Sequence, residues 1–291
     1  MGIHDLLASL GVQAPPGVTA AALNAFEADT RLRLPESVRA LYAACDGAVL
    51  PQGRLRILPL AGVREHVRGF RDFGIPERWG YLPFTDDNDS DPFCVCCAPP
   101  LTGYVVQVLH DDGAAIKFRS LGRFLAALHG FVAEGGRDLY GLPSDFDNEA
   151  RTAGDIETGR ALLRLAPDLE GVEQGDACRF GMWLLPGDLI GEITPLLQVG
   201  DEYVREDATR RLAAIHSPEA AQALRDAQQD MARFVERCAE ALRRAGVQAT
   251  IKNGTDLTAG PQGRGVNARM YYAMRAEPDV FDRLVNQFRA P

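Results

Sequence analysis

Residues 34–60 constrain the fold of this chain more than any other segment, because they predict a helix, a stop and a strand in close succession. Pro35 favours the first turn of the helix, since proline has no amide hydrogen to leave unpaired and its φ is close to helical. Three apolar side chains then recur at helical spacing and predict one buried face: Val38, Leu41 and Tyr42. Asp46 and Gly47 end the helix, because glycine adopts the left-handed conformation without steric cost. A strand over residues 55–60 follows.

The elements expected around this unit are helices first, then an antiparallel meander, then a closing helix. Besides the helix at Pro35, helices are predicted over residues 3–10, 19–31, 63–73 and 121–133, with Thr19 and Ser120 as caps. Strands are predicted over residues 79–85, 92–98, 104–110 and 114–118. Asp111, Asp112 and Gly113 form a tight-turn signal that joins the last two strands as a hairpin. Segregated helices and strands of this kind indicate an α+β domain.

The helix at Pro35 with its Asp-Gly end, together with Phe26-Glu27 on the preceding helix, resembles the N-terminal signature of the SUKH superfamily. Ser120 followed by Phe124-Leu125 matches a terminal pattern of the same family. The resemblance covers roughly the first 135 residues, about one domain, and it implies the same α+β element order. The superfamily includes fungal cell-wall synthesis regulators and many bacterial immunity proteins of toxin–immunity pairs. Six residues that match the signature are expected to be structural: Phe26, Leu34, Pro35, Tyr42, Gly47 and Phe124.

The composition changes after residue 135, where glycine, proline and acidic residues become frequent. We therefore expect a SUKH-like domain over residues 1–135, a linker over 136–153 and a second α+β domain of unrecognised family over 154–291. In the second domain the expected helices span residues 154–165, 201–215, 217–227, 230–245 and 278 onward. The expected strands there span residues 177–185, 247–252 and 268–276.

The net charge and the length of the apolar runs limit the classes of partner that this chain can have. The formal net charge is −9, and a negative surface repels nucleic acid and suits a basic partner. No apolar run approaches the about eighteen residues of a membrane span, and the N-terminus lacks the pattern of a signal peptide. We expect a cytoplasmic protein without nucleic-acid or membrane partners. Only two of the 31 basic residues are lysine, Lys117 and Lys252, which favours a GC-rich, bacterial genome.

Six cysteines are too unevenly placed to form a disulfide framework. Cys94, Cys96 and Cys97 crowd one expected strand, but zinc needs four ligands, normally from two Cys-x-x-Cys pairs, and no second pair exists. Because side chains alternate along a strand, Cys94 and Cys96 should face one side and Cys97 the other. We expect small apolar packing residues there, with no metal and no cofactor.

Residues 86–91 look at first like a calcium loop. With Asp87 at position one, Pro92 occupies the sixth position, where glycine is required, and Ala98 occupies the twelfth, where glutamate is required. An EF-hand is therefore excluded. Three interpretations stay open: a solvated turn whose side chains cap their own backbone, a negative patch that engages a partner's arginines or lysines, and a weak adventitious calcium site.

No organised catalytic set is visible in the sequence. The five histidines are scattered, and no His-Glu-x-x-His or Gly-x-Ser-x-Gly motif is present. The glycine-rich residues 260–265 lack the lysine and the following helix of a phosphate loop, so a hairpin connection is expected. These observations favour a binding protein over an enzyme.

The resemblance implies an immunity protein that docks on a cognate toxin acting in the cytosol and occludes its active site. Such toxins are often nucleases, deaminases or ADP-ribosyltransferases with basic clefts, toward which an acidic inhibitor is steered. The residues expected to contact the toxin are Trp79, Asp86, Asp87, Asp89, Asp91, Asp111 and Asp112. The alternatives are a regulatory or scaffold protein with contacts through residues 201–245, and an enzyme housed in the second domain. No oligomeric state follows from the sequence.

Overall fold

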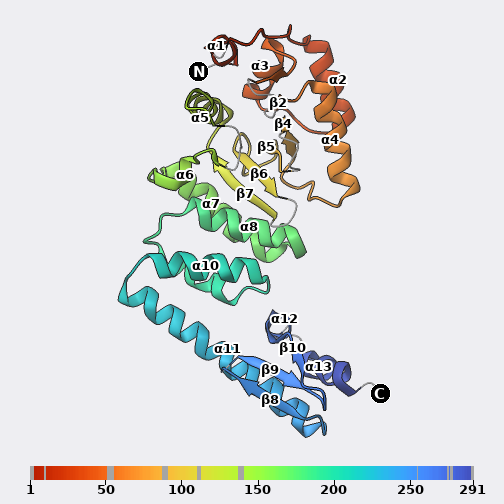
Figure 1. Cartoon of the computed structure of the whole chain (residues 1–291), viewed down its shortest axis with the longest axis vertical. Helices are drawn as coiled ribbons and strands as arrows, with labels where there is room; N and C mark the ends of the chain where they lie inside the picture. Colours follow the sequence, from red (N-terminus) through yellow and green to blue (C-terminus); the bar gives the residue numbers. More distant parts are fainter. Residues whose placement is uncertain are drawn as a thin grey trace. The chain divides into compact units, whose positions relative to one another are not determined.

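The chain folds into two compact units, Met1–Leu185 and Pro186–Pro291 (Figure 1). The computed structural model describes residues 3–9, 11–50, 56–86, 91–109, 113–136, 141–253, 255–273, 275 and 278–289. Each unit has a hydrophobic core of its own.

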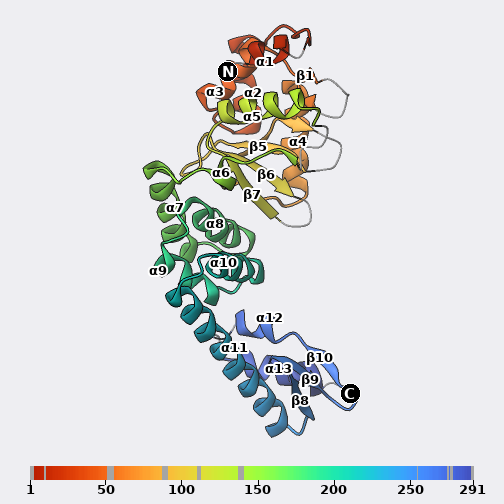
Figure 2. The same ribbon diagram turned by 60° about the vertical axis from the view of Figure 1, so that its left-hand side comes forward.

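Five helices surround the core of the first unit. They are α1 (Ile3–Ser9), α2 (Ala20–Thr30), α3 (Glu36–Ala44), α4 (Leu60–Asp72) and α5 (Leu121–Ala133). Figure 2 shows α5 beside α1 and α3, with which it is in contact. The hydroxyls of Thr19 and Ser120 accept backbone hydrogen bonds at the starts of α2 and α5, which confirms both predicted caps.

Asp46 and Gly47 follow the end of α3 and lie close in space to the start of α4. Gly47 has φ of +82°, and a Cβ atom there would lie 2.6 Å from the Pro59 nitrogen, so only glycine fits. The Asp46 carboxylate accepts a hydrogen bond of 2.7 Å from the Leu60 amide, the first of α4. The Asp-Gly pair therefore follows the end of α3 and also caps the start of α4 through this hydrogen bond.

Two antiparallel sheets lie within the helices of the first unit. One has the order β1-β2-β4, formed by β1 (Ala48–Val49), β2 (Arg56–Ile57) and β4 (Thr85–Asp86). The other is a meander of order β3-β5-β6-β7, formed by β3 (Tyr81–Pro83), β5 (Phe93–Cys96), β6 (Val105–Leu109) and β7 (Gly113–Phe118). The predicted α+β class and the pairing of β6 with β7 are thus confirmed.

Both faces of the four-stranded sheet are buried. One face belongs to the core that the five helices cover, through Leu82, Phe93, Val95, Val105 and Phe118. The opposite face carries Tyr81, Cys94, Cys96, Val106 and Ile116. Cys97 belongs to the first core, so the predicted separation of Cys94 and Cys96 from Cys97 is confirmed.

Helix α8 (Gly171–Leu184) covers the second face of the sheet. The Tyr81 hydroxyl donates a hydrogen bond of 3.0 Å to Asp176, and Trp79 packs edge-on against Phe180 with ring centroids 6.0 Å apart. Helix α7 (Ala153–Leu165) crosses α8 where two glycines meet. A Cβ atom on Gly159 would lie 2.8 Å from the Gly181 carbonyl oxygen, so these glycines set how closely the two helices approach.

A buried carboxylate fastens α7 to the SUKH-like part of the first unit. Asp155 accepts hydrogen bonds from Arg119 Nε at 2.8 Å, from the Tyr104 hydroxyl at 3.0 Å and from the Thr152 amide at 2.7 Å. Burial acts to raise the pKa of Asp155, but the hydrogen bonds from Thr152, Arg119 and Tyr104 outweigh it and lower the pKa below its usual value. The carboxylate is therefore held in its charged form.

Residues beyond 135 are thus integrated into the first compact unit. The segment expected as a linker, 136–153, contains the short helix α6 (Asp145–Asn148), and the unit ends at Leu185. The strand expected over residues 177–185 is wrong, because residues 177–184 lie in α8. Most residues of α8 from Gly175 to Leu184 are buried between α7 and the sheet. The apolar residues of this segment therefore do not alternate with polar ones at helical spacing.

The second unit starts with α9 (Ile190–Ile193), the 3-10 helix η3 (Thr194–Gln198), α10 (Glu202–Ala214) and α11 (Pro218–Arg244). The two helices predicted over residues 217–227 and 230–245 are one continuous helix, α11, because no glycine or proline separates them. It is followed by β8 (Ala249–Lys252), β9 (Asp256–Ala259), β10 (Arg264–Val266), α12 (Ala268–Ala273) and α13 (Val280–Arg289). The strand predicted over residues 268–276 is wrong, because its described residues 268–273 form α12.

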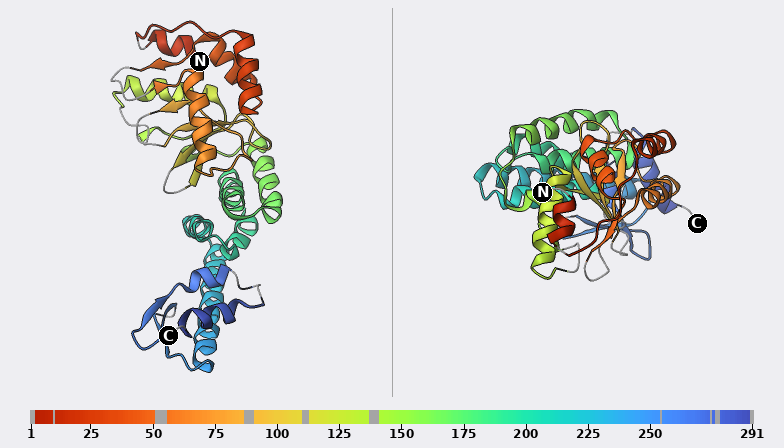
Figure 3. Two further views of the ribbon diagram at one scale, coloured as in Figure 1. Left: turned by 90° about the vertical axis from the view of Figure 1, so that its right-hand side faces the viewer. Right: turned by 90° about the horizontal axis from the view of Figure 1, so that it is seen from above.

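The second core lies between α11, α12, α13 and a three-stranded sheet of order β10-β9-β8. Figure 3 (left) shows these blue elements gathered around α11, which contacts β8, β9, α12 and α13. Ile251, Leu257 and Val266 lie opposite one another in the register and face the core. Val280, Leu284 and Val285 of α13 are buried in it, and Phe281 and Phe288 are partly buried.

Candidate protein-interaction surface

The two acidic segments predicted to contact a partner are attached at the same end of the four-stranded sheet. Phe93, at the start of β5, pairs with Gln107 near the end of β6. The Val108 amide donates to the Pro92 carbonyl oxygen at 3.1 Å, and Gln107 Nε2 donates to the Asp91 carbonyl oxygen at 3.4 Å. Because adjacent antiparallel strands run in opposite directions, the described residues at the start of β5 and at the end of β6 lie side by side.

Two of the predicted carboxylates have structural partners within the fold. Asp86 on β4 forms an ion pair with Arg56, its direct cross-strand neighbour on β2, and such pairs stabilise a sheet. Asp91 is 2% exposed and is engaged within the fold. Both are therefore poor contact residues. The other four predicted carboxylates, Asp87, Asp89, Asp111 and Asp112, lie outside the described residues.

Trp79, the predicted hydrophobic anchor, is not at the surface. Its side chain is 0% exposed and lies against Phe180 of α8. An anchor residue must reach a pocket on its partner, which this tryptophan does not do in the described conformation. This burial could not be predicted, because residues 177–185, most of which lie in the covering helix α8, are expected from the sequence to form a strand.

The cysteine-rich strand has neither the geometry nor the chemistry of a metal or catalytic site. All six cysteines are buried and free. Burial raises the pKa of the Cys94 and Cys96 thiols and, with the charge of Glu27, raises that of Cys97 to about 12. Thiols held in the neutral form are weak nucleophiles and weak metal ligands. Among the residues the structure describes, no group of three His, Cys, Asp or Glu side chains is placed to hold a metal ion.

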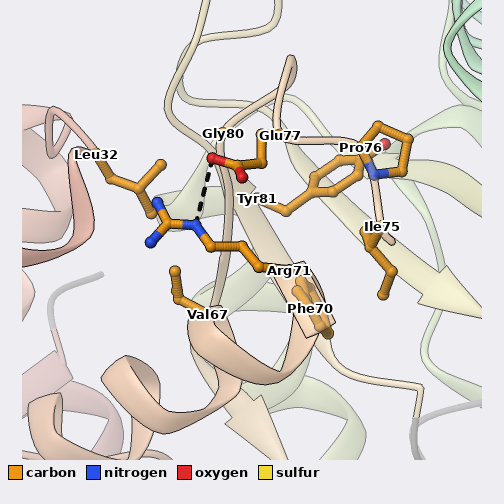
Figure 4. A pocket seen from close by; sticks show the side chains of 9 residues that line it. All are labelled: Leu32, Val67, Phe70, Arg71, Ile75, Pro76, Glu77, Gly80 and Tyr81. Atoms are coloured by element: carbon orange, nitrogen blue, oxygen red, sulfur yellow. Dashed lines mark ion pairs between the residues drawn. The ribbon is translucent and has the colours of Figure 1, made fainter. Parts of the chain in front are cut away.

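A small hollow lies between the end of α4 and the start of β3 (Figure 4). Its lining is mostly apolar: Leu32, Val67, Phe70, Ile75, Pro76 and Tyr81, with Arg71, Glu77 and Gly80. Arg71 reaches across to Glu77, with Nε 3.3 Å from the carboxylate, and donates to the Thr30 carbonyl oxygen at 2.5 Å. The hollow has a volume of about 20 Å³, which is enough for one water molecule, so it is not a substrate site.

Phe73 lies in the sequence between Arg71 and Ile75, which line this hollow, and its side chain is exposed. From the sequence it is predicted only to belong to a helix. Its side chain is 86% exposed, although the backbone around it is held by hydrogen bonds from the amides of Phe73, Gly74 and Ile75 to carbonyls of α4. An aromatic side chain on an ordered helix end suits contact with a protein partner. One sequence feature could have indicated that Phe73 is exposed. It is the last residue before Gly74, and it does not continue the helical spacing of the buried residues Val63 and Val67.

Helices α2 to α5 around an antiparallel meander make up most of an N-terminal domain whose sequence matches the SUKH superfamily. Within it, residues 17–127 match the sequence model of the SMI1 / KNR4 family (SUKH-1). This family comprises toxin immunity proteins and fungal regulators that are generally non-catalytic. No curated protein matches the chain. Among the described helices, none has both the length and the apolar character needed to cross a membrane.

Proposed function

We propose that this protein is an immunity protein that binds a cognate bacterial toxin in the cytosol and occludes its active site. The observation that carries the proposal is the match of residues 17–127 to the SMI1 / KNR4 family. The expected toxin is a nuclease, deaminase or ADP-ribosyltransferase with a basic cleft. A chain with net charge −9 is steered toward such a cleft, which raises the association rate.

The contact surface we propose is the end of the meander where the two acidic connections emerge. Asp86 is half-buried and paired, and Asp91 is buried, so neither is a free charge. The carboxylates proposed to meet the toxin are therefore Asp87, Asp89, Asp111 and Asp112. Phe73 on the ordered end of α4 is a second exposed candidate.

The test is to replace Asp87, Asp89, Asp111 and Asp112 together by asparagine and measure binding to the toxin domain encoded beside the gene. The expected result is weaker binding at about 50 mM salt and a smaller loss of affinity between about 50 and 300 mM salt, because exposed charges are screened by salt. A matched control removes four carboxylates elsewhere on the first unit: Glu65, Glu134, Glu157 and Asp168, all exposed.

The control variant should bind as the unchanged protein does. If both variants bind equally well at both salt concentrations, the acidic end of the sheet is not the contact surface. If the unchanged protein itself does not bind the neighbouring toxin or protect cells from it, the immunity function is refuted and the regulatory alternative is favoured.

A further inference from the structure

The second unit carries an open groove between two of its helices. α11 contributes Arg237, Glu240, Ala241, Arg244 and Ala245, and α13 contributes Phe281, Asp282 and Val285. Its volume of about 480 Å³ lies within the range of ligand-sized concavities. The side chains between its rims are apolar, since Ala241, Ala245, Phe281 and Val285 are all part of or packed on the second core.

The two walls of the groove carry opposite unpaired charges. On α11, Glu240 and Arg244 form an ion pair with each other, whereas Arg237 has no ion pair among the described residues. Its guanidinium lies 4.9 Å from the centroid of the Phe281 ring, which holds it at the rim while leaving its edge free to donate. On α13, Asp282 is exposed and also has no described partner.

A two-fold axis makes such a groove complementary to itself. In a symmetric dimer, residue i of one copy contacts residue j of the other and the reverse contact follows automatically. One cationic wall and one anionic wall, separated by apolar side chains, therefore find their complements in a second copy of the same groove. Arg237 would pair with Asp282 of the second copy, twice per dimer.

We propose that the α11–α13 groove is a homodimer interface, in which the four helices of two copies pack around paired Arg237 and Asp282 side chains. Nucleic acid is the less suitable occupant, because Asp282 and Glu240 would both face its phosphates. A small anionic ligand is also less suitable, because the Asp282 carboxylate would repel it. The inference is independent of toxin binding and does not require it.

Charge exchange between copies tests the proposal. The variants Arg237→Asp and Asp282→Arg each place like charges opposite one another at both contacts of a dimer. We expect each to raise the dimer dissociation constant by about tenfold or more, measured by sedimentation equilibrium of the full chain from roughly 1 to 100 μM. Mixing the two variants should restore association, because every contact in the mixed dimer is then between opposite charges. The double variant should also dimerise.

Matched controls apply the same charge changes away from the groove. Lys252→Asp on β8 and Asp188→Arg ahead of α9 alter exposed residues and should leave the dissociation constant unchanged. Circular dichroism checks folding, and Arg237→Gln with Asp282→Asn serve as milder variants where a reversal disturbs it. An unchanged protein that stays monomeric at about 100 μM, single variants that dimerise as it does, or folded single variants that do not associate when mixed would each overturn the proposal.

Discussion

Removing the Asp155 carboxylate is expected to loosen α7 and α8 from the SUKH domain. Asp155 is 1% exposed and accepts hydrogen bonds from Arg119, Tyr104 and Thr152. Breaking a buried ion pair by removing one partner costs about 3–5 kcal/mol. Arg119 keeps Glu149 as a second partner and is 16% exposed, so we expect Asp155→Ala to cost about 3 kcal/mol, at the lower end.

The chain itself supplies a selective probe for this loss. Its two tryptophans, Trp79 and Trp183, both lie in the first compact unit, so their fluorescence reports the unfolding of that unit alone. For a unit of this size a loss of about 3 kcal/mol corresponds to a Tm lower by roughly 6–12 °C. Glu157→Ala, on the exposed side of the same helix, should change stability by less than about 0.5 kcal/mol.

The pH dependence gives a second readout with a definite sign. The hydrogen bonds lower the pKa of Asp155 in the folded state. The contribution of this carboxylate to the free energy of unfolding is therefore fully present above the usual aspartate pKa of about 3.9. It is lost as pH falls through the lower pKa that Asp155 has in the folded protein. The difference in stability between the unchanged protein and Asp155→Ala should therefore narrow only below about pH 4. Equal Tm values at pH 7, or a difference that does not narrow in acid, would refute the assigned role of this carboxylate.

Three further predictions concern the first unit. Gly47→Ala should cost more than about 1 kcal/mol, because alanine would have to adopt φ of +82° and approach Pro59, whereas Gly69→Ala in open space on α4 should be neutral or stabilising in the same thermal melts. The six buried cysteines should not react with a thiol reagent in the native protein and should all react in denaturant, and rapid reaction of any one under native conditions would contradict the assigned burial. Phe73→Ser should leave Tm within about 1 °C, since an exposed side chain contributes little to folding; a large drop would show that the ring packs against the protein.

The first half of the chain could be predicted closely because its local signals agree with its tertiary structure. Thr19 and Ser120 cap helices whose apolar faces lie on the core side, and the Asp46-Gly47 pair has a backbone conformation that only glycine adopts easily. In such segments, caps, period and turn residues all favour one structure. The additional bond from Asp46 to the start of α4 could not be predicted, because it depends on where Leu60 returns in space.

The errors fall where tertiary packing outweighs local pattern. Most residues from Gly175 to Leu184 of α8 are buried, so this part of the helix is mainly apolar and aromatic and its sequence resembles a strand. α12 is a short helix whose consecutive tyrosines reach separate partners, Tyr271 to Gln287 and Tyr272 to Asp230. Those partners are distant in the sequence, so nothing local distinguishes this helix from a strand.

The position of α8 also bears on where a toxin can bind. A sheet with one uncovered apolar face would be the natural place for a partner, and the SUKH part of the chain by itself has such a face, with Tyr81, Cys94, Cys96 and Val106. Here α8 occupies it through the Tyr81–Asp176 hydrogen bond and the contact between Trp79 and Phe180. Displacing α8 would uncover Trp79 and break the hydrogen bond between Tyr81 and Asp176, a cost that a rigid inhibitor avoids by binding through surfaces already exposed. Phe73 at the end of α4, which is 86% exposed, meets that requirement and supports the contact proposed for it.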